Sequence, residues 1–184
     1  CTQLSGVVFG EGLAEIGAAA FDGCWRMLSA SLPLSVTNVA STAFNGCTSL
    51  AGVTVPTHGG RMSEWFAPVY SQIRDVTVPE GETDVRADMF EGCRSLESLI
   101  IGSGVRDIDE YAFANHPNLK NVVLSEGLKR ISKGAFEGCT SLGSIVIPES
   151  VISLDNSAFR GCLSMKEIFV RYGNMKYASS CGCL

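Results

Sequence analysis

Residues 135–148, AFEGCTSLGSIVIP, contain the pattern that decides the fold. A Phe-x-Gly-Cys motif begins at Phe136, and Ile145 and Ile147 alternate with other residues before Pro148. Alternation with a period of two predicts a short β-strand with one buried face. Because a Pro cannot donate the next ladder hydrogen bond, Pro148 marks the end of that strand.

The same pattern recurs every 23 residues along the chain. The motif begins at Phe21, Phe44, Phe90, Phe136 and Phe159, and a variant runs from Phe113 to His116. A period that never slips indicates a structural repeat. One such unit cannot bury its apolar side alone, whereas stacked copies share a continuous core. The sequence therefore predicts a mainly β repeat solenoid with a long parallel sheet on one side and short turns or single helical turns on the other.

We expect residues 1–184 to form one solenoid domain. Cys1 falls three residues after a Phe that is absent, so we expect a fragment that begins in the middle of a repeat. The unit at 56–78 keeps its length but has Ala67 where the Phe belongs, and the end at 173–184 is irregular.

The divergent unit is crowded with aromatic residues around Trp65. In one interpretation, Phe66 or Trp65 refills the vacated Phe pocket by a local shift. In the other, Trp65 is an exposed aromatic knob for a partner, since aromatic side chains are enriched in the centres of interfaces.

The composition excludes two classes of partner. The net charge is −5 with only 14 Lys and Arg, whereas nucleic-acid binding needs a concentrated basic surface. No stretch approaches the ~18 uninterrupted apolar residues of a membrane span. We therefore expect neither nucleic-acid binding nor membrane insertion.

Candidate catalytic and metal-binding residues do not form a recognisable site. His116 occupies a Cys position, which predicts a buried imidazole, and His58 precedes two glycines, where we expect a lone exposed histidine. The carboxylates near Asp107 fall in a repeat turn, where a solvated face is expected. No nucleophile elbow, phosphate loop or dinucleotide fingerprint is present. The sequence predicts neither an enzyme nor a cofactor or metal site.

The eight cysteines do not indicate four disulfides. Equivalent side chains of stacked repeats point the same way, whereas a disulfide needs facing Cβ atoms. Six cysteines share one repeat position, namely Cys1, Cys24, Cys47, Cys93, Cys139 and Cys162. We expect free, buried thiols in this column. Whether Cys181 and Cys183 are paired, modified or free stays open.

The consensus L-x-x-V-x-I-P-x-x-V-x-x-I-x-x-x-A-F-x-G-C resembles the BspA-like, or Treponema-type, leucine-rich repeats. This resemblance implies a right-handed leucine-rich-repeat horseshoe with a concave parallel sheet. It also implies an extracellular or cell-surface protein, secreted or anchored, that is often associated with adhesion.

A candidate partner-binding surface follows from the strand alternation. Alternate residues of a strand point to opposite faces of the sheet. If the strand residues Val122, Ile145 and Ile168 are buried, their neighbours project outward as one row of apolar side chains, namely Ile100, Val123, Val146 and Phe169. Charged residues border it at Glu97, Lys120 and Lys166. An apolar strip with a polar border is typical of interaction surfaces, although β-branched residues also simply favour exposed strand positions.

These observations predict a non-enzymatic, adhesin-like interaction module that binds a protein or glycan ligand through the sheet face. Two alternatives remain. The chain could be a structural spacer that displays another domain, or a regulatory repeat module of a larger intracellular protein.

Overall fold

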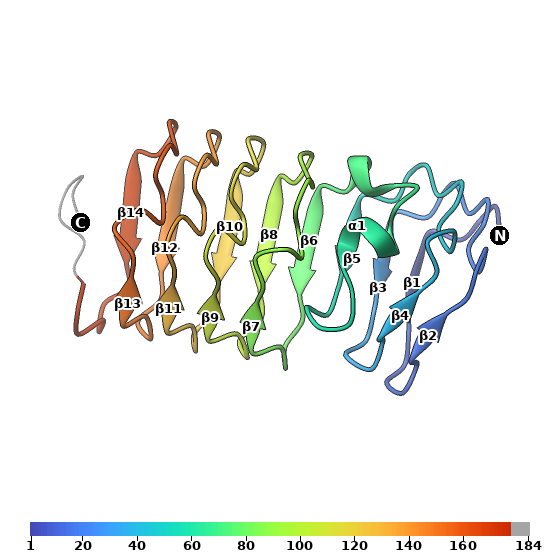
Figure 1. The fold of residues 1–184 in the computed structure, drawn as a ribbon, viewed down its shortest axis with the longest axis horizontal. Coiled ribbons are helices and arrows are strands. Elements are labelled where there is room, and N and C mark those ends of the chain that lie inside the picture. The colour runs from blue at the N-terminus through green and yellow to red at the C-terminus, as the bar shows by residue number, and fades with distance from the viewer. Residues whose placement is uncertain (178–184) are drawn as a thin grey trace.

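A computed structural model describes residues 1–177 as a β-solenoid in which successive repeats lie side by side along one long axis (Figure 1). Each repeat contributes one strand to the first row. These strands are β1 (Gly6–Val8), β3 (Ser29–Ser31), β5 (Gly52–Thr54), β6 (Asp75–Val78), β8 (Ser98–Ile101), β10 (Asn121–Leu124), β12 (Ser144–Ile147) and β14 (Glu167–Val170). The predicted repeat solenoid is confirmed.

The first row is a parallel sheet whose register follows the repeat. Strands β1, β3, β5, β6, β8 and β10 pair in that order, and β12 pairs with β14. Val76 lies opposite Leu99, and Leu99 lies opposite Val122, so each residue faces its equivalent 23 positions away. A parallel ladder with this register keeps one face of every strand directed into the core.

A second row of two-residue strands forms the other side of the solenoid (Figure 1). Its members are β2 (Glu15–Ile16), β4 (Asn38–Val39), β7 (Asp84–Val85), β9 (Asp107–Ile108), β11 (Arg130–Ile131) and β13 (Ser153–Leu154). Strands β7, β9, β11 and β13 form one parallel sheet, and β2 pairs with β4. The side for which the sequence predicted short turns or single helical turns therefore also contains short paired strands.

The Phe of each repeat builds the centre of the core. Phe90, Phe113 and Phe136 are fully buried, and their rings stack with centroid separations of 5.0 and 5.5 Å. Phe159 continues the stack at 5.6 Å but is only partly buried. Stacked rings at this spacing add to the burial of apolar surface, so the column holds neighbouring repeats together.

The turn after each Phe needs a residue in the left-handed region. Gly138, two residues after Phe136, has φ +73°, and Asn115 has φ +59° at the equivalent position. Asn tolerates this conformation better than most residues with a Cβ. The repeat can therefore replace this Gly with Asn115 and keep the turn.

The column cysteines are free thiols throughout the described part of the chain. Five of them are buried, whereas Cys1 is exposed, so the expectation of a shielded column is wrong at its first position. Burial raises the pKa of the Cys93 and Cys139 thiols to about 12. These thiols pack as small apolar groups and stay protonated at neutral pH. Cys181 and Cys183 lie outside the described residues.

The divergent repeat refills the Phe pocket with the residue before it. A single-turn helix, α1 (Met62–Trp65), brings Phe66 into the stack, where its ring lies 4.9 Å from that of Phe44. This confirms the local shift that compensates for Ala67. The Phe66 ring is fully buried.

Trp65 is not the exposed knob that one interpretation of the sequence proposed. Its side chain is only 3% exposed, because it lies against the loop at Gly59 and Gly60. A Cβ at Gly60 would overlap the indole Nε1. The two glycines therefore make the room in which the indole is buried, and Trp65 is unavailable to a partner.

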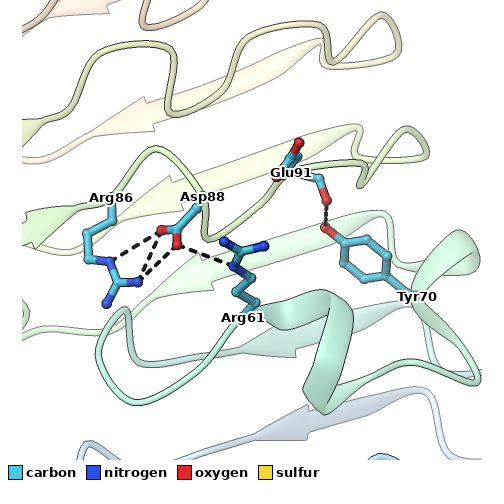
Figure 2. A network of polar contacts seen from close by, with 5 residues as sticks. All are labelled: Arg61, Tyr70, Arg86, Asp88 and Glu91. Carbon is cyan, nitrogen blue, oxygen red and sulfur yellow. Dashed lines mark hydrogen bonds and ion pairs between the residues drawn. The ribbon is translucent and has the colours of Figure 1, made fainter.

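Polar contacts fasten the divergent unit to the next repeat (Figure 2). Asp88 accepts hydrogen bonds from Arg86 at 3.1 Å and from Arg61 at 3.3 Å. The 3₁₀ turn η1 (Tyr70–Gln72) places the Tyr70 hydroxyl 2.8 Å from the Glu91 carbonyl, to which it donates. Tyr70 stands at the repeat position of the Cys, and its side chain extends to the following repeat.

His58 is half exposed, as expected, but it is not a lone histidine. Its Nδ1 lies 2.7 Å from the buried carboxylate of Glu82, and its Nε2 lies 2.6 Å from the Leu34 carbonyl. Thr57 also donates to Glu82. The imidazole therefore links three consecutive repeats, a structural role that corrects the expectation of an isolated side chain.

Candidate interaction surface

The outward-facing residues of the C-terminal strands form a row of large apolar side chains, which we call the outward ladder. The exposed fractions of its members are 43% for Ile100, 53% for Val123, 43% for Val146 and 46% for Phe169. Partners in the strand pairing connect them, since Val123 lies opposite Ile100 and Val146 lies opposite Phe169. The predicted row is thus exposed and consists of two residue pairs in register, one on β8 and β10 and one on β12 and β14, and β12 lies beside β10.

The pleat of each strand explains why this row faces outward. In β12, Ile145 and Ile147 are buried in the core while Val146 between them is exposed. In β8, Leu99 is likewise buried beside the exposed Ile100. Alternate strand residues project from opposite faces, so the core packing fixes the direction of the ladder.

The same face changes character toward the N-terminus. There the equivalent positions hold Ser31, Thr54 and Thr77, which are partly buried. These small side chains help to line a shallow cavity of about 220 Å³. Val8 in β1 is also exposed in this column, but Ser31, Thr54 and Thr77 separate it from the run of neighbouring apolar residues that begins at Ile100.

A row of charges borders the ladder. Lys120 Nζ lies 3.0 Å from one Glu97 carboxylate oxygen, and Arg74 lies 3.8 Å from the other. The hydrogen bond from Lys120 lowers the pKa of Glu97. Lys166 extends the border and is exposed, with no ion pair in the described part of the chain. The border is therefore charged and carries a net positive charge over these four residues.

Asp107 and His116, the sequence candidates for a catalytic or metal site, take part in contacts within the fold. Asp107 lies 3.0 Å from Arg130 on the outer side of the second sheet, and His116 is buried. Within residues 1–177, no group of three metal-binding side chains is found. No helix in that range is long and apolar enough to cross a bilayer.

Sequence reasoning missed the contact between His58 and Glu82. The two residues are 24 positions apart. Glu82 occupies the buried repeat position that holds Val36, Val105, Leu128 and Val151, so a carboxylate there indicated that a polar partner lies nearby. The repeat period then places the 58 loop beside the 82 loop.

Comparison with solved structures identifies similar solenoids. A leucine-rich repeat protein from Bacteroides ovatus is 24% identical, with a TM-score of 0.57 over 96% of this chain and 47% of that chain. A leucine-rich repeat protein from T. pallidum is 27% identical, with a TM-score of 0.50 over 88% of this chain and 78% of that chain. This chain thus spans about half of the Bacteroides protein's length.

Pneumococcal vaccine antigen PcpA is a third similar structure. It is 20% identical, with a TM-score of 0.51 over 88% of this chain and 49% of that chain. Comparison with curated proteins found no match.

The family comparison covers almost the whole chain. The model of the BspA type leucine-rich repeat region matches residues 1–65 and 63–181 in six copies. These matches include both the regular repeats and the divergent one, whose compensating shift keeps it in register. The chain belongs to the BspA-type leucine-rich repeat family.

Proposed function

We propose that this chain is a non-enzymatic interaction module of a secreted or cell-surface protein, and that it binds a protein partner through the outward ladder. The observation that carries the proposal is the row of four large apolar side chains held about half exposed on paired strands. Solenoid repeats typically present such extended surfaces to partners. The family resemblance supports the cell-surface location.

The ladder fits a protein better than a glycan. Full burial of a Val, Ile or Phe side chain contributes roughly 1.5–3 kcal/mol, so burying the exposed half of each ladder residue contributes about 1 kcal/mol. Four adjacent residues form an apolar centre of the kind that proteins bury against each other. The charged border with Lys120 and Lys166 then favours a partner with acidic groups around its apolar contact.

Site-specific photo-cross-linking tests the proposal. A benzoylphenylalanine replaces Val146 on the ladder or, as a matched control, Ile152, which is 60% exposed but lies outside the first sheet. Intact cells or secreted proteins of the source supply the partner, and mass spectrometry identifies the adducts. We expect one partner to be cross-linked from position 146 and not from position 152.

Two results would contradict the proposal. Adducts from position 152 alone would move the binding surface to the second side of the solenoid. The absence of adducts from both positions, with folded protein in each case, would favour the structural spacer.

A further inference from the structure

The charged border of the outward ladder has its own order along the solenoid. In each repeat the border position lies three residues before the ladder residue, and from β8 to β14 it holds Glu97, Lys120, Gly143 and Lys166. Strands β8, β10, β12 and β14 lie side by side, so the ladder and its border form one patch of four strands (Figure 1). The middle of this patch lies between β10 and β12.

The two ends of the border carry opposite charges. Glu97 lies on the first strand of the patch, where its carboxylate is partly exposed and accepts a hydrogen bond of 3.0 Å from Lys120. Lys166 lies on the last strand, is exposed, and makes no ion pair among residues 1–177. An acid and an unpaired base therefore stand equally far from the middle of the patch.

A two-fold axis through this middle makes the patch complementary to itself. The axis runs parallel to the strands, between β10 and β12, so β8 of one copy lies over β14 of a second copy and β10 lies over β12. Strand direction is the same in both copies, and residues of one repeat position meet. Ile100 then meets Phe169 of the second copy, and Val123 meets Val146. Glu97 meets Lys166 of the second copy, and this ion pair occurs twice.

Other two-fold axes do not give this match. An axis between β8 and β10 places Val146 over Thr77 and Phe169 over Thr54, so half of the ladder meets hydroxyl groups. An axis along the solenoid, centred on the ladder, reverses the strands and places Lys166 over Tyr172 of the same repeat. Only the axis between β10 and β12 pairs every ladder residue with another ladder residue and the base with the acid.

The charges of the patch do not repel a second copy. Residues 97–102, 120–125, 143–148 and 166–171 include two acidic and three basic side chains. One of the bases, Arg171, is paired with Glu126 at 3.2 Å. The four others balance, and they are Glu97, Glu167, Lys120 and Lys166.

The size of the patch predicts a weak complex. Four strands at a spacing of about 4.8 Å, each contributing about six residues at 3.3 Å, cover roughly 400 Å² on each copy. Interfaces that bury less than about 1,200 Å² in total belong to weak, transient complexes. Monomer and dimer should therefore exchange at micromolar concentrations.

We propose that the protein bound by the outward ladder is a second copy of this chain, held face to face about the two-fold axis between β10 and β12. The inference rests on the proposed function, because it names the partner of the same surface. The border supplies both the acid and the base that such a partner needs.

Sedimentation equilibrium of the purified chain over roughly 5–500 µM measures self-association. We expect a reversible monomer–dimer equilibrium. Glu97→Lys alone and Lys166→Glu alone each place like charges opposite each other at both contacts, so each should weaken the dimer at least about tenfold. An equal mixture of these two variants has opposite charges at both contacts and should dimerise about as strongly as the wild type. Lys133→Glu, at an exposed position outside the first sheet, should change nothing.

The outcomes separate this inference from the proposed function. A chain that stays monomeric at every concentration, while position 146 cross-links a different protein, would overturn the inference and leave the proposed function standing. A monomeric chain without any adduct from position 146 would overturn both. A dimer that the two single variants do not weaken, or that their mixture does not restore, would overturn the proposed two-fold arrangement.

Discussion

The Cys139 thiol donates a hydrogen bond of 3.1 Å to the backbone carbonyl of Phe113, the Phe of the preceding repeat. The same bond joins Cys47 to Phe21 and Cys162 to Phe136, each at 3.2 Å. The thiol therefore satisfies a carbonyl of the neighbouring turn as well as filling space. This relationship explains why the column holds cysteines that are not disulfide-bonded.

Shielding of the column is open to a direct chemical measurement. We expect five of the six described cysteines to resist a colorimetric thiol reagent in the native protein, while the exposed Cys1 reacts. Denaturation without a reductant should release at least the six thiols of the described residues. Two or fewer thiols in the denatured protein would mean that disulfides form instead.

Stability should fall in alkali because of these thiols. Burial raises the pKa of Cys93 and Cys139 from 9.0 to about 12, so the unfolded chain loses these protons first as the pH rises. The stabilisation is complete below about pH 9 and is lost between about pH 9 and 12, by up to roughly 1.4 kcal/mol per pH unit for each thiol. Urea unfolding at a series of pH values measures it. Replacing both cysteines with Ala should make the loss less steep, with the remainder due to groups such as Cys47 and Cys162, whose pKa burial also raises. An equally steep loss in that variant would contradict the assignment to Cys93 and Cys139.

Loss of a central Phe should be severe. Phe113 is fully buried between Phe90 and Phe136 in the stack, so Phe113→Ala should lower the free energy of unfolding by about 3–5 kcal/mol. Phe159→Ala serves as the comparison, since Phe159 is only partly buried and should cost less. Chemical denaturation followed by circular dichroism gives both values, and a smaller loss for Phe113→Ala would contradict the stacked core.

The divergent repeat depends on the room beside Gly60. A Cβ there would overlap Trp65 Nε1, so Gly60→Ala should displace the indole and destabilise the protein by about 1–3 kcal/mol. Gly10→Ala is the matched control, because nothing lies within 4 Å of the added Cβ. Tryptophan emission should shift to the red only in Gly60→Ala, since Trp25 is already 45% exposed. An unshifted spectrum would place Trp65 elsewhere.

The repeat itself could be predicted because its period never slips. Once Phe113 and Phe136 define the register, the alternation around Val146 follows from the pleat, and the structure has this side chain exposed between buried Ile145 and Ile147. The sequence also anticipated that Phe66 could replace the missing Phe. Positions with a fixed residue type in every repeat are thus predictable from one repeat alone.

Contacts that occur only once could not be predicted in this way. The burial of Trp65 depends on Gly60, and the partner of His58 is Glu82 in the following repeat. Neither pair recurs, so no column of the repeat records it. The unpaired Nδ1 of His116 likewise depends on the direction of the ring, which the sequence does not contain.

The affinity of a ladder variant for its partner tests the central claim most directly. Val123→Lys with Val146→Lys puts two charges into the outward ladder, whereas Ile152→Lys with Leu163→Lys puts two charges on exposed apolar residues outside the first sheet. The partner is the protein cross-linked from position 146, and titration calorimetry measures Kd for each variant. We expect the ladder variant to remain folded, within about 1 kcal/mol of the wild type, and to bind at least about a hundredfold more weakly, with the control unchanged. Undiminished binding by the folded ladder variant would contradict the account.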